Sequence, residues 1–154
     1  MNDQQWVSAA PFRAHLNHVC AGAGVHWAVV AVHAGLPLGV IGHLLDPRPD
    51  RRVQRISGRL ARRLFAIDAG FLDALRTTTV AAEPSRRAAR RLCSHSWSTD
   101  ALAHRLHLSR AQLASLVSGN ARHVPALVDL QVRALLALTE AARSDLPGRP
   151  RRAA

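Results

Sequence analysis

Residues Trp97–Gly119 read WSTDALAHRLHLSRAQLASLVSG, and their leucines fall into two successive amphipathic periods. The apolar register shifts at Leu108–Ser109, where one helical period stops and another begins. Ser109 is a suitable N-cap for the second helix because its hydroxyl can accept an unpaired backbone N–H. Small Ala103 lies where the first helix must let the second approach closely. The pattern predicts a helix-turn-helix, and an ordinary helical hairpin with a leucine core is the alternative with the same spacing.

The second helix of a helix-turn-helix lies in the major groove of DNA, where its outward side chains meet the base edges. The polar outward positions of this helix carry hydroxyl and guanidinium groups, which can bond bases or phosphates. The side chains expected to contact bases here are Ser109, Arg110, Ser115 and Ser118.

The charge of the chain favours a polyanionic partner. Its 154 residues contain 21 Lys+Arg against 10 Asp+Glu, a formal net charge of +11, and every one of the strong cations is an arginine. Neutralising phosphates releases counterions, so such an excess favours nucleic acid. The alternative for any single arginine is a solvated helix position in a protein from a GC-rich genome.

The motif occurs twice. An offset near 73 pairs Val7–Pro11 with Val80–Pro84 and Val19–Cys20 with Leu92–Cys93. In the turn of the first copy stands Gly35, the residue expected for a left-handed conformation, whereas His107 takes that place in the second copy. A shared fold unit explains this correspondence better than chance.

The repeat divides the chain into a first helix-turn-helix unit at 1–67, a linker at 68–83, a second unit at 84–142 and a disordered basic tail at 143–154. Ala, Leu and Arg dominate and aromatic residues make up only 4% of the chain, so an all-α fold of two tandem small helical units is expected. Each unit should end in a closing helix, over Ser57–Ile67 and Pro125–Leu138.

In the linker, the threonines at 77–79 should be extended and flexible. The apolar residues Phe71, Leu72 and Leu75 should dock on one unit and shorten the effective linker.

The chain resembles the small tandem helix-turn-helix proteins of actinobacteria and their phages. The resemblance rests on the aromatic residue that opens each hairpin, the turn, the Ser- or Pro-led second helix and the closing helix after an arginine loop. The second unit, with LSRAQLASLVSG followed by Pro125, is also similar to the lambda-repressor-like domain. The resemblance implies a DNA-binding regulator. The first unit departs from the pattern because its second helix, Pro37–Leu45, has only His43 as a polar side chain.

Base contact by the first unit is therefore expected from His43 alone. Arginines in the loops and at the start of the second unit can position the protein on phosphates without reading sequence. The residues expected on the DNA backbone are Arg48, Arg51, Arg52, Arg55, Arg86, Arg87, Asn120 and Arg122. In the tail, Arg149 and Arg151 flank Pro150 as in an AT-hook, which predicts contact with a minor groove; a plain basic tail is the alternative.

The sequence gives little evidence for a metal, cofactor or catalytic site. Nine histidines and two cysteines show no standard zinc spacing, so neither metal nor cofactor is expected. Cys20 and Cys93 should be reduced and face the core of their own unit, and Trp27 and Trp97 should belong to those cores rather than stack on bases. No catalytic constellation, signal peptide or uninterrupted apolar span is present, so an enzyme or a membrane protein is not expected.

Three functions remain. The first is a cytoplasmic transcriptional regulator, monomeric because two joined units replace the usual dimer on double-stranded DNA. The second is an adaptor whose hairpins contact RNA polymerase or another regulator, because the first unit's second helix presents an almost apolar outward face. The third is a sequence-indifferent architectural DNA binder.

Overall fold

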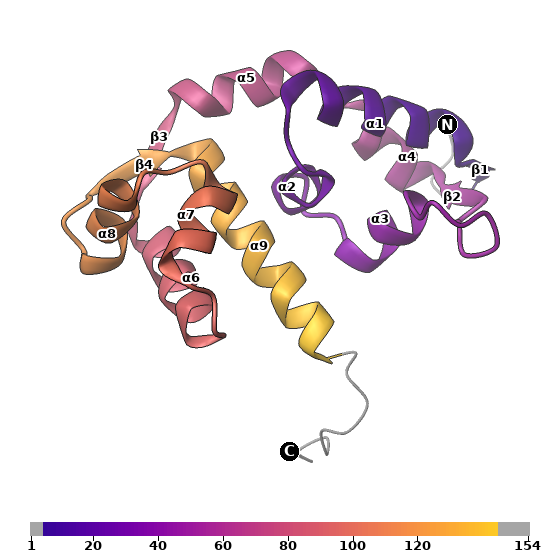
Figure 1. The fold of residues 1–154 in the computed structure, drawn as a ribbon. Coiled ribbons are helices and arrows are strands. Elements are labelled where there is room, and N and C mark those ends of the chain that lie inside the picture. The colour runs from indigo at the N-terminus through magenta and orange to yellow at the C-terminus, as the bar shows by residue number, and fades with distance from the viewer. Residues whose placement is uncertain (1–4, 145–154) are drawn as a thin grey trace, which may run out of the picture.

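The computed structural model describes residues 5–144, and helices form most of this range (Figure 1). In chain order, the first half contains β1 (Trp6–Ser8), α1 (Ala10–Ala23), α2 (Trp27–His33), α3 (Leu38–Leu44), β2 (Arg55–Ser57), α4 (Gly58–Phe65) and α5 (Ala69–Thr77). The second half contains β3 (Thr79–Ala81), α6 (Glu83–Ser94), α7 (Thr99–Leu106), α8 (Arg110–Ser118), β4 (His123–Pro125) and α9 (Ala126–Ser144). The expected helical class is confirmed, with two small sheets in addition.

The order of strand, three helices, strand and helix occurs twice, in a first copy (residues 6–65) and a second copy (residues 79–144). Equivalent backbone hydrogen bonds close both copies. The Ala9 N–H donates to the carbonyl of Gln54 and the Ala82 N–H donates to the carbonyl of Arg122, each at 2.9 Å. The internal repeat of the sequence therefore corresponds to a repeated chain path.

Each copy contains a two-stranded antiparallel sheet that joins its beginning to the segment before its last helix. Val7 pairs with Ile56 in the first sheet, and Val80 pairs with Val124 in the second. The purely helical expectation was wrong on this point, because strands of three residues are too short to show an alternating pattern. The sheets tie the loop after α3 and the loop after α8 to the body of the protein.

Side-chain caps determine where several helices begin. Ser98 Oγ accepts the Ala101 N–H at 3.1 Å at the start of α7, and Ser57 Oγ accepts the Leu60 N–H at 3.3 Å at the start of α4. The predicted N-cap at Ser109 is confirmed, since its Oγ accepts the Gln112 N–H at 3.1 Å. These caps satisfy N–H groups that have no partner inside the helix.

The turn residues of the two copies differ in type but agree in conformation. Gly24 and Gly35 of the first copy have φ of 64° and 60°. Ser96 and His107 take the equivalent places in the second copy with φ of 72° and 55°. The left-handed conformation expected at Gly35 and His107 is thus confirmed, and the second copy adopts it at a steric cost that glycine avoids.

Helix α9 belongs to both hydrophobic cores. Leu130 and Ala134 pack in the core of the first copy, whereas Val132 and Leu135 pack in the core of the second. Figure 1 shows α9, in yellow, lying between the two halves of the molecule. The helix extends to Ser144, six residues beyond the predicted end at Leu138, so part of the expected tail is helical.

The expected linker is largely helical. Asp68 caps α5 by accepting the Phe71 N–H at 2.7 Å, and α5 packs against α1 and α9. Leu72 is buried in the first core, with Phe71 and Leu75 partly buried against it, as predicted. Of the threonines predicted to be extended, Thr77 instead ends α5, whereas Thr78 and Thr79 are extended and Thr79 begins β3.

Candidate nucleic-acid interface

Helix α8 presents a polar face to solvent. Leu113 and Leu116 are buried beneath it, while Arg110, Gln112 and Ser118 are exposed. Ser115 is half-buried at one side of this face. Three of the residues predicted for base contact, Arg110, Ser115 and Ser118, therefore lie on one short helix, and Ser109 lies at its N-terminus.

Ser109 and Gln112 form a reciprocal capping box at the start of α8. The Ser109 N–H donates to Gln112 Oε1 at 2.8 Å, and the Gln112 N–H donates to Ser109 Oγ. The side-chain amide of Gln112 keeps its NH2 group available for hydrogen bonding. Sequence reasoning missed Gln112 as a surface group, although its position three residues after Ser109 is the signature of a capping box.

Arg110 forms an ion pair with Asp100 of the same chain. Its Nε and Nη2 lie 2.7 and 2.8 Å from the two carboxylate oxygens of Asp100, in the first turn of α7. The arginine side chain is 79% exposed, and the aspartate side chain 63%. The fork orients the guanidinium over the start of α8, and a base or phosphate would have to share it or displace Asp100.

Helix α3 offers much less hydrogen bonding than α8. Its exposed residues are Gly39, Val40 and His43, and His43 alone carries a polar side chain. A side chain at Gly42 would lie 3.6 Å from Trp27 Cη2, so this glycine faces the neighbouring helix rather than solvent. The first copy can therefore give only one hydrogen-bonding side chain to bases from α3.

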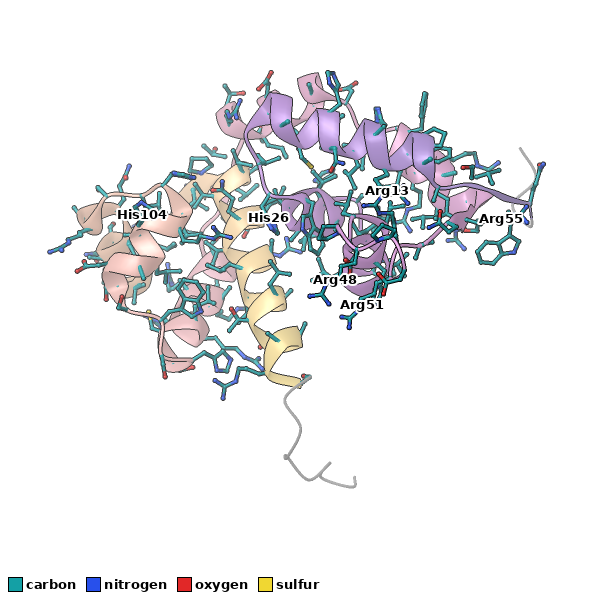
Figure 2. All side chains as sticks on the ribbon, turned by 45° about the vertical axis from the view of Figure 1, so that its right-hand side comes forward. Arg13, His26, Arg48, Arg51, Arg55 and His104 are labelled. Atoms are coloured by element: carbon teal, nitrogen blue, oxygen red, sulfur yellow. The ribbon has the colours of Figure 1, made fainter. Side chains whose placement is uncertain are left out.

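The arginines after α3 divide into two groups. Arg52 donates to the carbonyls of Asp46 and Pro47, at 2.9 and 3.0 Å, and Arg55 donates to the carbonyl of Trp6 at 2.8 Å. The side chains of Arg48 and Arg51 make no hydrogen bond or ion pair with any residue that the structure describes. Figure 2 shows Arg48 and Arg51 on the same loop, away from Arg55. Arg48 and Arg51 are thus the better placed for phosphate.

Arg86 holds the loop after α8. It is paired with Glu83 at 2.5 Å and donates to the carbonyls of Gly119 and Ala121, at 3.4 and 3.2 Å. Its side chain is only 20% exposed, so contact with phosphate would require these bonds to break. Arg87 is exposed and lies 4.0 Å from Glu83, which leaves it available.

Arg13 holds the corresponding loop of the first copy, and sequence reasoning missed it. Its Nε and Nη2 donate to the carbonyls of Leu44 and Val53, at 2.7 and 2.9 Å. Arg13 and Arg86 are related by the repeat offset of 73, which was the signal available in the sequence.

The remaining predicted backbone contacts, Asn120 and Arg122, are exposed in the loop between α8 and β4. They follow the C-terminus of α8 in the chain. Arg149 and Arg151, predicted for the minor groove, lie outside the described residues.

Both cysteines are free thiols partly buried in their own cores, as predicted. Burial raises the pKa of Cys20 to about 11, so its thiol stays protonated at neutral pH. Trp27 and Trp97 also pack against the cores as predicted, and Trp97 Nε1 donates to Thr139 Oγ1 at 3.3 Å.

Within residues 5–144, no group of three or more His, Cys, Asp or Glu side chains is placed to hold a metal ion. No helix in this range has both the length and the apolar character needed to cross a membrane.

No protein-family model, curated protein or solved structure matches this chain.

Proposed function

We propose that the protein is a cytoplasmic transcriptional regulator that binds double-stranded DNA through two helix-turn-helix units, α2–α3 and α7–α8. The second unit reads bases in the major groove with Arg110, Ser109, Ser115 and Ser118. Arg48, Arg51, Arg87 and Arg122 contact phosphates, together with Asn120. The chain acts as a monomer because it carries two units.

The observation that carries this proposal is the geometry of α7 and α8. The two helices pack against each other across a turn with His107 in the left-handed conformation, and α8 turns a polar face outward. The exposed positions of α8 are the polar Arg110, Gln112 and Ser118 and the small Ala111 and Ala114, which allow close approach of a base edge. The net charge of +11 supports a phosphate-rich partner.

A binding-site selection from random duplexes tests the proposal. The full chain should enrich a defined sequence, and footprinting should show two half-sites about one helical turn, roughly 34 Å, apart. Changes of base pairs under the second copy should reduce affinity more than changes under the first, because α3 offers only His43. Uniform, salt-sensitive binding without enrichment would favour the architectural alternative instead.

A second candidate function, that of a protein-binding adaptor, rests on a groove in the first copy. Trp6, Pro37 and Val40 line this groove of about 460 Å³, with Trp6 59% and Val40 38% exposed. The equivalent groove of the second copy, about 360 Å³, contains Gln112 and Ser115.

An apolar groove of this kind suits the side chains of a partner such as RNA polymerase or another regulator. Absence of DNA binding at low salt, with capture of purified polymerase that Trp6→Ala and Val40→Ser abolish, would favour this function over the first.

A further inference from the structure

A cavity of about 470 Å³ lies where the two copies meet. Its walls come from the end of α1, the start of α2, the end of α7 and the middle of α9. Figure 2 shows His26 and His104, two of the lining residues, on the first and second copies respectively. A molecule bound there would contact both copies and the helix that they share.

The lining combines apolar walls with basic groups and contains no carboxylate. Val25, Val29 and Leu138 are among the apolar lining residues. The nitrogen-bearing side chains of the lining are those of His26, His104, Arg105, His107 and Gln131. A cavity of this size and character suits a small molecule with an apolar body and a negatively charged end.

Two groups from different copies can hold such a negative end. The Ala28 N–H donates to His26 Nδ1 at 3.2 Å, so a neutral His26 carries its proton on Nε2 and can donate it. Burial and the charge of Arg105 both lower the pKa of His26, which keeps its ring neutral at pH 7. Arg105 itself makes no hydrogen bond or ion pair with another residue in the described range.

His107 adds a further observation. In the first copy the equivalent turn position is Gly35, which adopts the left-handed conformation without steric cost. The second copy holds a histidine in this conformation, and that histidine lines the cavity. The left-handed turn is common to both copies, and in the second copy it places an imidazole in the cavity wall.

We propose that this cavity binds a small apolar monocarboxylic acid, with its carboxylate between Arg105 and His26 and its hydrocarbon body against Val25, Val29 and Leu138. Arg105 gives a charge-assisted hydrogen bond, and His26 gives a neutral one through Nε2. Because the acid touches α2 and α7, it bridges the two copies. An effect on DNA affinity rests on the proposed function, whereas binding of the acid does not.

Titration of the ¹⁵N-labelled full chain with sodium octanoate, followed by amide chemical shifts, tests the site. Octanoate should saturate and shift amides of α2, α7 and the middle of α9. Two control probes test the two parts of the ligand one at a time. The first is 1-octanol, which lacks the charge, and the second is sodium phosphate, which lacks the apolar body. Octanol should bind at least about tenfold more weakly, since a hydrogen bond to a charged group contributes that much or more. Phosphate should also bind at least about tenfold more weakly, because it buries no apolar surface against the cavity wall.

Three variants locate the carboxylate. Arg105→Gln should weaken octanoate binding about tenfold or more, whereas Arg122→Gln, which removes an exposed arginine outside the cavity, should leave it unchanged. His107→Gly removes left-handed strain from the turn and a basic side chain from the cavity wall, so the fold should be kept and octanoate binding should weaken. Circular dichroism melts check that each variant is folded.

Several results would overturn the proposal. They are no saturable binding of octanoate, equal binding of octanol or phosphate, and equal weakening by Arg105→Gln and Arg122→Gln, which would indicate general attraction to a basic surface. These results are independent of DNA, so a failure of the proposed function and a failure of this site are distinguishable.

Discussion

Asp100 and Arg110 join the first turns of α7 and α8 through two hydrogen bonds, with Arg110 Nε 2.7 Å from Oδ1 and Nη2 2.8 Å from Oδ2. The pair neutralises the one arginine on α8 while fixing the direction of its guanidinium. Under the proposed function, Asp100 should limit attraction to arbitrary DNA and leave Arg110 aligned for a guanine edge.

Replacing Asp100 by Asn should therefore raise affinity for random duplexes several-fold and steepen the salt dependence by about one unit of slope, because one more cation meets phosphate. Affinity for the selected site should rise less, so the specificity ratio falls. Asp73→Asn, which removes the ion pair of Arg76 on α5 while Arg76 still donates to the Ala23 carbonyl, is the control and should change neither quantity. Fluorescence anisotropy at several salt concentrations measures the affinities and the salt slope. An unchanged ratio of the affinity for the selected site to that for random DNA in Asp100→Asn would contradict the assigned role.

Arg110→Ala and Arg51→Ala should have different consequences. The first should cost roughly 1–3 kcal/mol on the selected site and much less on random DNA if Arg110 bonds a base. The second removes an unpaired loop cation, so both affinities should fall alike and the salt slope should decrease by about one. Equal losses for Arg110→Ala on the two DNAs would make it a phosphate contact.

Ser85→Ala should destabilise the fold. Ser85 is fully buried and its Oγ donates to Asp129 Oδ1 at 2.7 Å, which links α6 to α9. Removing the hydroxyl leaves a buried carboxylate oxygen without this donor, at a cost of about 1–3 kcal/mol in the free energy of unfolding. Ser94→Ala, whose exposed hydroxyl bonds the carbonyl of Arg91, is the control and should stay within about 0.5 kcal/mol. Urea unfolding compares the two.

His107→Gly should stabilise the protein by about 0.5–1 kcal/mol, because relief of the left-handed strain exceeds the entropy that glycine adds to the unfolded chain. The reverse change in the first copy, Gly35→His, should destabilise it, since a Cβ there would lie 3.2 Å from Arg63 Nη2. Thermal melts of both variants test the comparison. A destabilising His107→Gly would show that the imidazole contributes more than the strain costs.

Stability should decrease as the pH falls below about 6.5. Burial lowers the pKa of His33, and burial together with Arg105 lowers the pKa of His26. The folded state then binds fewer protons than the unfolded state, so the stabilisation is fully present above the unfolded pKa and is lost as pH falls through the folded pKa. His33→Gln should flatten the dependence of the unfolding free energy on pH, and an unchanged profile would contradict this assignment.

The parts of the fold that could be read from the sequence are those with local signals. The Ser109 cap, the left-handed His107 and the docking of Leu72 each follow from residue type and spacing within a few positions. The relation between Gly35 and His107 also follows from the repeat. These features depend on backbone sterics and helix periodicity, which act over short separations.

The features that could not be predicted from the sequence form only between segments that are far apart in the chain. β1 and β2 pair residues about fifty positions apart and are too short to show a period. Arg86 resembles its neighbour Arg87 in the sequence, yet the loop carbonyls of Gly119 and Ala121 engage only the former. The fork between Asp100 and Arg110 likewise requires the crossing of α7 and α8, which spacing alone does not give.

Helix α9 has a consequence for how the chain unfolds. Because Leu130 and Ala134 belong to one core while Val132 and Leu135 belong to the other, neither copy can melt without exposing apolar side chains of the other. Burial of this kind couples the two copies energetically. Two copies without a shared helix could unfold in two independent steps, whereas the shared helix should couple those steps.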